Sequence, residues 1–381
     1  MRPTHKHSAG WFCVIIALRK ERLKVAIIGL SSSGKTTVFN ALTGLNIQTN
    51  VYPTTAGEPH IGVVKVPDSR IEKVSEIFRP QKTTYAIIEY VDYIGLTKGD
   101  MAQNRKVFDL IKDVDAVVHV VRAFEGDAVS HPLGNVDPLR DIGTIELELI
   151  FGDLEFVEKR LERMEEGIKR GKKPDEPERK LLFKCKDFLD KEIALRDVEF
   201  REEEQKAMKP LQFLSTKPEV VVLNVGESAI NTDRLRDLQS STAMRFPSLY
   251  ILAMCGKMEM EIAQLSPADA ELFLDDMGIH EPAAKKLINI CYNILGLISF
   301  FTYAGDEVKA WTVTRGASAQ RAAGKVHSDI ERGFIRAEVI SFDDFISAGS
   351  IHAAREKGLL RLEGKTYEIR DGDIINFRFN V

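Results

Sequence analysis

One short run of residues limits the possible folds of this chain more than any other feature. Residues 24–44 read KVAIIGLSSSGKTTVFNALTG: an apolar β-branched stretch, then Gly29, then Gly34-Lys35-Thr36, then a helical pattern. This order of strand, glycine-rich loop and helix is typical of a phosphate-binding loop, whose glycines let successive N–H groups point at a phosphate. The run therefore predicts an α/β domain built around a nucleotide phosphate site.

Each residue type in this loop has an expected task. Lys35 is expected to bridge the β- and γ-phosphates of a nucleotide, and the Thr36 hydroxyl is expected to bind Mg²⁺. The other loop residues predicted to bind nucleotide are Gly29, Ser31, Ser32, Ser33, Gly34 and Thr37.

A second apolar run, AIIEYVDYIG (86–95), ends in Asp92-x-x-Gly95. A carboxylate at this position can hold Mg²⁺ through water, and the Gly95 N–H can meet the γ-phosphate. The next residue is Leu96, where Ras-like proteins have a glutamine that orients the attacking water. Because an apolar side chain cannot do so, we expect hydrolysis to be slow or assisted differently.

Further apolar runs follow at 115–122, 219–225 and 248–254, with helical stretches between them. This alternation predicts a doubly wound, mostly parallel sheet with the site at the carboxyl ends of its strands. One run continues as VVLNVGE, in the position where G proteins read the base. The predicted base-site residues are Asn224, Val225, Glu227, Cys255 and Gly256.

Composition restricts the rest of the chain. Its 381 residues are 44% hydrophobic, enough for two or three packed domains. The formal net charge of -4 provides no global basic field, so any RNA contact has to come from local patches. The four cysteines lack CxxC spacing, which argues against zinc and disulfides. The apolar run WFCVIIAL is too short to span a bilayer, so a cytoplasmic location and no membrane partner are expected.

From Ile145 onward, apolar residues recur every three or four positions among charged ones, which indicates a coiled-coil helix. The stretch KRGKKPDEPERK then predicts a turn before a returning helix. The hairpin either packs only on itself or binds a partner. Its basic tip at 169–173 suits rRNA phosphates and equally suits a solvated turn.

With these motifs identified, the chain resembles the YchF subfamily of Obg-related P-loop NTPases, the Obg-like ATPases, from about Leu23 to Val381. The resemblance is most specific in RLEGKTYEIRDGDIINFRFNV and the preceding FFTYAGDEVKAWTVTRGASAQRAAGKVHSDIERGFIRAEVISFDDF, which are similar to the family's TGS domain. It implies a TRAFAC-class G domain with an inserted helical coiled-coil arm and a C-terminal β-grasp (TGS) domain. The expected divisions are a leader at 1–22, a nucleotide-binding domain at 23–143 and 213–297, the arm at 144–212 and the TGS domain at 298–381.

The resemblance also implies which base is read. Guanine-specific proteins use NKxD, whose Asp accepts hydrogen bonds from two adjacent N–H groups of guanine. Here Asn224-Val225-Gly226-Glu227 lacks the lysine and has a longer acid. Because adenine offers one donor and one acceptor on that edge, a two-acceptor clamp has no purpose there. Family members with NxxE favour ATP over GTP.

Several residues depart from the family pattern. Residues 31–33 are Ser-Ser-Ser where the family usually has Pro-Asn-Val, which puts potassium-stimulated hydrolysis in doubt. The family's switch I threonine aligns with Ala56, so Thr54 or Thr55 is a candidate for its Mg²⁺ contact. The stretch after Gly95 is short and poor in glycine. The loop histidine proposed to activate water in the family aligns with His131, which is the candidate catalytic residue.

The resemblance thus implies a cytoplasmic, monomeric, Mg²⁺-dependent ATPase that couples a slow nucleotide cycle to the ribosome or rRNA, in translation or stress response. Two alternatives stay open. One is a GTPase of the same fold, and the other is a nucleotide-sensing adaptor with negligible hydrolysis, which Leu96 and Ala56 would favour.

Overall fold

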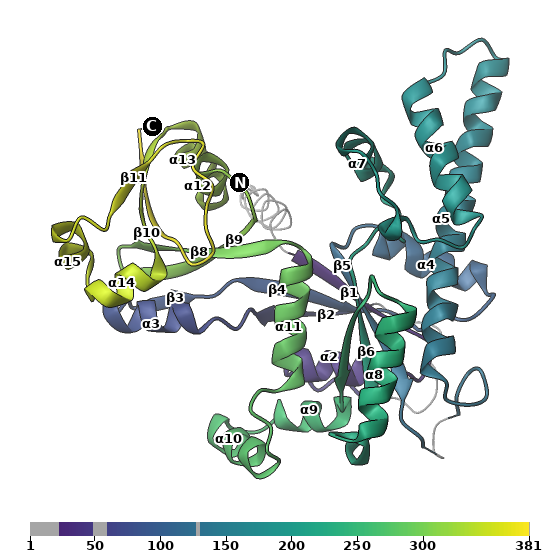
Figure 1. Cartoon of the computed structure of the whole chain (residues 1–381), viewed down its shortest axis with the longest axis horizontal. Helices are drawn as coiled ribbons and strands as arrows, with labels where there is room; N and C mark the ends of the chain where they lie inside the picture. The colour runs from purple at the N-terminus through teal and green to yellow at the C-terminus, as the bar shows by residue number, and fades with distance from the viewer. Residues whose placement is uncertain (1–22, 49–58, 127–129, 381) are drawn as a thin grey trace, which may run out of the picture. The chain divides into compact units, whose positions relative to one another are not determined.

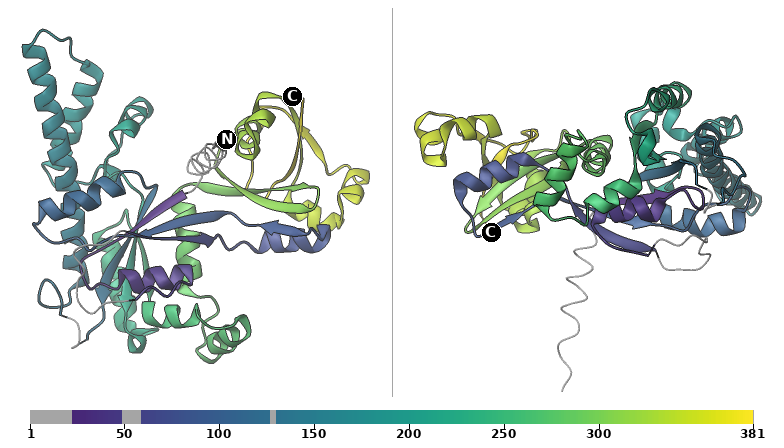
Figure 2. Two further views of the ribbon diagram at one scale, coloured as in Figure 1. Left: turned by 180° about the vertical axis from the view of Figure 1, so that it is seen from behind. Right: turned by 90° about the horizontal axis from the view of Figure 1, so that it is seen from below.

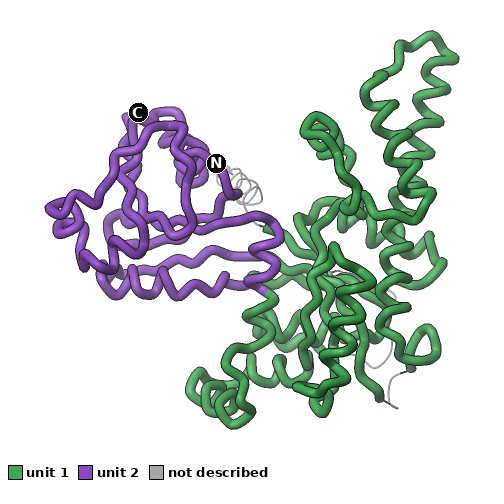
Figure 3. The backbone as a smooth tube through the Cα atoms, viewed as in Figure 1, with its two compact units in different colours: residues 1–63, 89–287 green, residues 64–88, 288–381 purple. Residues whose placement is uncertain are grey.

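The structure is a computed structural model that describes residues 23–48, 59–126 and 130–380. The chain forms two compact units. The first contains the residues up to Val63 together with Glu89–Leu287, and the second contains Val64–Ile88 together with Ile288–Val381 (Figure 3). The leader at 1–22 and the switch I candidates Thr54, Thr55 and Ala56 lie outside the described residues.

The first unit is built on a six-stranded sheet with the strand order β2-β4-β1-β5-β6-β7 (Figure 1). Strands β1, β5, β6 and β7 run parallel to one another. Strand β6 is buried along its whole length, as expected of a parallel strand with helices on both faces. The strands are β1 (Leu23–Ile28), β2 (His60–Lys65), β4 (Ile87–Asp92), β5 (Ala116–Ala123), β6 (Glu219–Val225) and β7 (Tyr250–Met254).

Helices connect these strands and bury apolar side chains against the sheet. One core cluster joins β1, β4 and β5 to the helices α4 and α5. Outside the helical arm, the helices of the first unit are α2 (Lys35–Thr43), α4 (Met101–Ile111), α8 (Asp233–Arg245), α9 (Gly256–Ile262) and α10 (Pro267–Asp276), while α11 (Ala283–Ile294) begins in the first unit and ends in the second.

A helical arm interrupts the first unit between β5 and β6. Helix α5 (Pro138–Lys169) runs for 32 residues and pairs with the returning α6 (Glu176–Leu189), as Figures 1 and 2 show. Apolar residues of both helices form one cluster, so the predicted hairpin packs on itself. Helix α5 begins at Pro138, before the predicted arm boundary, because Asp137 caps it and proline suits a first helical turn. The arm ends in α7 (Glu202–Met208) and short 3-10 helices at Leu195–Asp197 and Lys209–Leu211.

Buried polar residues close the base of the arm. We call them the arm-base cluster: Glu146, Asp153, Arg196, Ser215 and Glu219. Asp153 accepts hydrogen bonds from the backbone N–H groups of Leu214 (2.8 Å) and Ser215 (2.7 Å) and from the Ser215 hydroxyl (2.6 Å). Arg196 donates to Glu146 (2.6 Å) and to Glu219 (2.9 Å). The cluster therefore ties α5 to strand β6.

The second unit has its own six-stranded mixed sheet, in the order β11-β10-β12-β8-β9-β3. Strand β12 lies parallel to β8, whereas the β8–β9 and β10–β12 pairs are antiparallel. This central parallel pair is what a β-grasp arrangement requires. The strands are β3 (Lys82–Thr84), β8 (Leu297–Ala304), β9 (Glu307–Thr314), β10 (Phe334–Ile340), β11 (Arg361–Glu363) and β12 (Ile374–Phe379). The helices are α3 (Ser69–Phe78), α12 (Ala319–Val326), α13 (Ser328–Arg332), α14 (Phe342–Ala348) and α15 (Ile351–Glu356).

Residues 64–88 belong to this second unit, although the sequence places them within the nucleotide-binding domain at 23–143. The physical reason is that α3 and β3 fold with the C-terminal residues. Strand β3 pairs in parallel with β9, and the Phe78 ring stacks against those of Tyr303 and Phe345.

In the part of the chain that the structure describes, no helix combines the length and the apolar character needed to cross a membrane.

Candidate nucleotide-binding site

The loop between β1 and α2 has a backbone that only small residues can adopt. Gly29 has φ 148°, and a Cβ there would lie 2.3 Å from the Val120 carbonyl oxygen. Gly34 has φ 93°, and a Cβ there would lie 2.1 Å from the Asn224 side-chain nitrogen. Ser32 also has a positive φ, of 61°. The left-handed turns and close approaches thus explain the spacing of the glycines.

Lys35 begins helix α2 and is buried inside the loop. Its Nζ donates a hydrogen bond to the carbonyl oxygen of Leu30 at 2.9 Å. Burial lowers the pKa of Lys35 to about 8, against the opposing attraction of the Asp92 carboxylate. A buried ammonium with a single backbone acceptor is suited to receive an anion. The following predicted residue, Thr37, is half-buried on α2.

Thr36 and Asp92 meet beside this lysine. The Thr36 hydroxyl donates to Asp92 Oδ2 at 2.7 Å, and His60 Nδ1 lies 3.6 Å from the same oxygen. Burial raises the pKa of Asp92, while the Thr36 hydrogen bond and the Lys35 charge oppose that rise. The other carboxylate oxygen, Oδ1, is buried and has no hydrogen-bond partner within the described residues. A hydroxyl beside a carboxylate with a free oxygen is a donor set that fits Mg²⁺.

The chain after Asp92 packs tightly onto the loop. A Cβ on Gly95 would lie 2.7 Å from Ser31 Oγ and 2.8 Å from the Ser31 backbone, so only glycine fits. The Leu96 N–H donates to the Gly29 carbonyl at 3.0 Å, and its side chain is 1% exposed in the core. Leu96 is therefore a packing residue here. The Ser33 hydroxyl is buried and has no partner among the described residues.

Asn224, at the end of β6, braces two other loops. Its amide nitrogen donates to the Ser33 carbonyl at 3.0 Å, and its amide oxygen accepts from the Gly256 N–H at 3.0 Å. A Cβ on Gly256 would lie 3.0 Å from that amide oxygen, a tight contact that favours glycine at this position. Asn224 thus holds the phosphate loop and the start of α9 in register.

The other predicted base-site residues differ in exposure. The Val225 side chain is buried in a cluster with Cys255 and Met258, so it faces the core. Burial raises the pKa of the Cys255 thiol. Glu227 opens a short 3-10 helix (Glu227–Ala229) and is exposed. Of these three side chains, Glu227 is therefore the one available at the surface.

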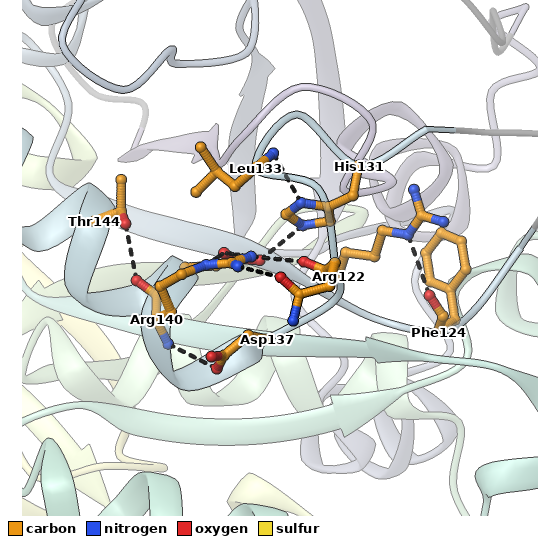
Figure 4. Close-up of polar contacts among 9 residues, drawn as sticks. Arg122, Phe124, His131, Leu133, Asp137, Arg140 and Thr144 are labelled. Carbon is orange, nitrogen blue, oxygen red and sulfur yellow. Dashed lines mark hydrogen bonds and ion pairs between the residues drawn. The ribbon is translucent and has the colours of Figure 1, made fainter.

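Two residues that the sequence reasoning missed lie at the carboxyl end of β5. The Arg122 guanidinium lies 4.6 Å from the centroid of the Phe124 ring, and its Nε donates to the Phe124 carbonyl at 3.1 Å (Figure 4). A Cβ placed on Gly226 would lie 3.8 Å from Phe124 Cβ, so Phe124 borders the base motif. The sequence signal was an arginine and an aromatic residue closing the apolar run VVHVVRAF.

His131 is bound through both ring nitrogens, as Figure 4 shows in part. Its Nε2 lies 2.8 Å from Asp141 Oδ2, and its Nδ1 accepts from the Leu133 N–H at 3.1 Å. Asp141 also accepts two hydrogen bonds from Arg140 through its other oxygen. The His131 ring is therefore held against the start of α5 with no lone pair left to accept a proton from water.

Residues 24–148 match the family model MMR_HSR1, described as a 50S ribosome-binding GTPase. Residues 297–380 match the model YchF-GTPase_C, described as a protein of unknown function (DUF933).

Two relatives extend over nearly the whole chain. A Bacillus subtilis (strain 168) protein named "Ribosome-binding ATPase YchF" is 40% identical over 369 residues, covering 94% of this chain and 100% of the relative. A protein with the same name from Escherichia coli O157:H7 is 38% identical over 361 residues, covering 94% of this chain and 99% of the relative.

Among solved structures, the Schizosaccharomyces pombe YchF GTPase is similar, with a TM-score of 0.79 and 26% identity. The alignment covers 94% of this chain and 98% of that one. The predicted resemblance to the YchF family and the predicted P-loop NTPase fold are both confirmed. The chain therefore belongs to the YchF family, and its nucleotide-binding domain has the P-loop GTPase fold.

Proposed function

We propose that this protein is a ribosome-binding, Mg²⁺-dependent ATPase that hydrolyses ATP to ADP and phosphate at a slow intrinsic rate. The observation that carries the nucleotide half of the proposal is the meeting of Lys35, Thr36 and Asp92, which leaves Asp92 Oδ1 buried without a partner among the described residues. The ribosome half rests on the names of the curated relatives.

At the phosphate end, the N–H groups of residues 29–37 would surround the β-phosphate, and Lys35 would turn from the Leu30 carbonyl to the phosphate oxygens. The hydroxyl of Thr36 and the carboxylate of Asp92 would hold Mg²⁺, which when bound neutralises charge on the phosphates. Gly95 would present its N–H to the γ-phosphate. Thr55, which lies outside the described residues, stays a candidate for a further metal contact.

At the base end, Asn224 would keep the two loops in place while backbone groups of Val225, Cys255 and Gly256 contact the base. The Cβ of Phe124 borders Gly226, and the Phe124 ring would cover a base face. Glu227 is exposed and on a longer arm than the aspartate of guanine-specific sites. This arrangement supports ATP in preference to GTP.

The slow rate follows from two positions. Leu96 is packed into the core and cannot orient water. His131 could act as a base only after its Nδ1 leaves the Leu133 N–H. Such release would make hydrolysis depend on a change in the loop, which supports a regulatory role in translation or stress response. We further propose that the protein is a cytoplasmic monomer and that its C-terminal β-grasp is a TGS domain.

A second candidate function is a GTPase, which the printed name of the Schizosaccharomyces pombe relative favours. A third is a nucleotide-sensing adaptor with negligible turnover, favoured by the buried Leu96.

Equilibrium binding of ATP and GTP to the purified chain with Mg²⁺ tests the proposal. We expect tighter ATP binding, and we expect Glu227→Asp to shift the preference toward GTP by about tenfold, or about 1.4 kcal/mol. Glu227→Asp is preferred to a substitution at Val225, because Glu227 is exposed whereas Val225 is buried in the core. Glu202→Asp, at an exposed acid on α7, is the matched control.

A wild type that prefers GTP would favour the GTPase. ATP binding without turnover, with and without ribosomes, would favour the adaptor.

A further inference from the structure

The residues between β2 and β4 form a physical connection between the nucleotide site and the C-terminal residues. The chain passes into the second unit after Val63 and returns at Glu89 (Figure 3). In the sequence, residues 64–88 thus lie between two parts of the candidate site. One part precedes β2, and the other is Asp92 at the end of β4.

Backbone pairing anchors one end of this segment. Strand β3 extends the C-terminal sheet, with Lys82 opposite Glu307 and Thr84 opposite Lys309. The Lys82 N–H donates to the Asp306 carbonyl at 3.0 Å. The Thr84 hydroxyl donates to the Glu307 carboxylate, which also pairs with the Lys82 ammonium. The second unit's sheet therefore includes a strand from the middle of the nucleotide motifs.

Helix α3 is anchored through its apolar face. Ile71 and Val74 are completely buried. The Phe78 ring stacks on Tyr303 with centroids 4.5 Å apart and on Phe345 with centroids 5.0 Å apart. Burial of these apolar side chains removes their surface from water and so stabilises the attachment.

A charged contact completes the attachment. Arg70 donates to Asp371 at 3.0 Å and lies over the Phe301 ring at 5.7 Å. Asp371 also accepts from the Ser299 N–H at 3.0 Å. Arg70 is further held by Asp68, the residue that caps α3. Helix α3 is therefore tied at its start to the loop around Asp371.

The connection back to the nucleotide site is short. Asp92 follows Ile88 by four residues, all within the hydrogen-bonded strand β4, and binds Thr36 directly. Between the anchored strand β3 and strand β4 lie only Tyr85 and Ala86, and two residues of chain span at most about 7 Å. This short connection limits how far β3 can move without shifting the start of β4.

We propose that residues 64–88 couple nucleotide binding at the phosphate end to ligand binding by the C-terminal unit. The inference rests on the proposed nucleotide binding and adds a regulatory route to it. A partner that holds the C-terminal unit biases the position of Asp92, and a nucleotide that engages Asp92 biases the C-terminal sheet. Because linkage is reciprocal, each ligand changes the affinity of the other by the same factor.

Hydrogen exchange of the full chain with and without a non-hydrolysable ATP analogue and Mg²⁺ tests this route. We expect the nucleotide to slow exchange in residues 29–37 and also in β3 and β9, the latter by about fivefold, at the lower end of allosteric coupling. In Arg70→Ala and in Phe78→Ala the response of β9 should fall by at least half. Arg70→Lys, which keeps one donor for Asp371, should retain more of the response than Arg70→Ala.

Arg361→Ala is the matched control, since Arg361 pairs with Asp373 and stacks on Tyr367 in the same unit. It should leave the response intact. Protection of residues 29–37 without any change in β9 would overturn the coupling while leaving nucleotide binding in place. An undiminished response in both Arg70→Ala and Phe78→Ala would overturn the route. Failure to protect residues 29–37 would reject both this inference and the proposed function.

Discussion

The phosphate end of the nucleotide site and the arm-base cluster are both made of buried polar side chains in the same unit. In the arm-base cluster, Asp153 accepts three hydrogen bonds, and Arg196 donates to two carboxylates. At the phosphate end, Asp92 Oδ1 and the Ser33 hydroxyl are buried without partners among the described residues. Buried polar atoms are nearly always hydrogen-bonded, so the two regions differ in what they still require.

This difference separates structural polar groups from ligand-binding ones. A cluster whose donors and acceptors are matched within the chain stabilises the fold. A cluster with unmatched oxygens beside a buried cation is arranged for a group that the described residues do not supply. Glu146 Oε1 is the exception in the arm-base cluster, since it also lacks a partner in the described part of the chain. Burial and the Glu219 carboxylate raise the pKa of Glu146, which makes that cluster sensitive to pH.

The largest expected effect is on the arm-base cluster. Asp153→Ala should lower the free energy of unfolding by about 4 kcal/mol, because it leaves three buried donors unpaired at about 1–3 kcal/mol each. ATP affinity of the folded variant should stay within twofold of wild type. Urea unfolding and equilibrium ATP binding measure the two quantities. Asp187→Ala, at an exposed acid on α6, should cost less than about 0.5 kcal/mol. Equal losses of stability in both variants would contradict the comparison.

Lys35→Ala should show the reverse of Asp153→Ala, with a large loss of ATP affinity and a small loss of stability. Loss of a charge-assisted contact to phosphate should weaken ATP binding about 100-fold, or roughly 3 kcal/mol, with little change in unfolding free energy. The same two measurements apply, and Lys180→Ala on the arm is the control. If Lys35→Ala kept ATP binding within threefold, the phosphate end would not be the ligand site.

Asp92→Asn tests the unmatched carboxylate oxygen. Its amide oxygen can still accept from Thr36, but the negative charge is lost. We expect the gain in ATP affinity on adding Mg²⁺ to fall by about tenfold, or about 1.4 kcal/mol. ATP titrations in Mg²⁺ and in EDTA measure this gain, with Asp109→Asn on α4 as control. An unchanged Mg²⁺ dependence would exclude Asp92 as part of the metal site.

The smallest effect concerns pH. Burial, followed by the nearby Glu219 carboxylate, raises the pKa of Glu146 to about 8. Folded Glu146 holds its proton more tightly than unfolded Glu146, so its stabilising contribution is complete at low pH and is lost as pH rises through about 8. Between about pH 7 and pH 9, wild type should lose about 1 kcal/mol relative to Glu146→Gln. Urea unfolding of both proteins at both pH values measures this loss. An equal change in unfolding free energy for wild type and Glu146→Gln between the two pH values would rule the prediction out.

The sequence predicted the phosphate loop, the DxxG motif, the strand alternation and the helical hairpin because each is local. Residues 24–44 contain a strand, its loop and its helix within one stretch, and the arm's apolar period is visible within α5 itself. Which distant residues each motif contacts was harder to predict than the motif itself. Asn224 is visible as part of NVGE, but its bond to Ser33 joins residues 191 positions apart. Its role as a brace cannot be read from either segment alone.

The sequence by itself therefore determined the class of this protein, since motif spacing and hydrophobic periodicity depend on neighbouring residues. Tertiary structure alone decided that residues 64–88 fold with the C-terminal unit, that Val225 faces the core and that His131 is bound by Asp141. It also decided that the Asp153 carboxylate is matched, while Asp92 Oδ1 has no partner among the described residues. The physical reason is that burial and hydrogen-bond matching depend on which distant residues meet: Arg70 and Asp371 lie 301 positions apart, and only the folded chain brings them within 3.0 Å.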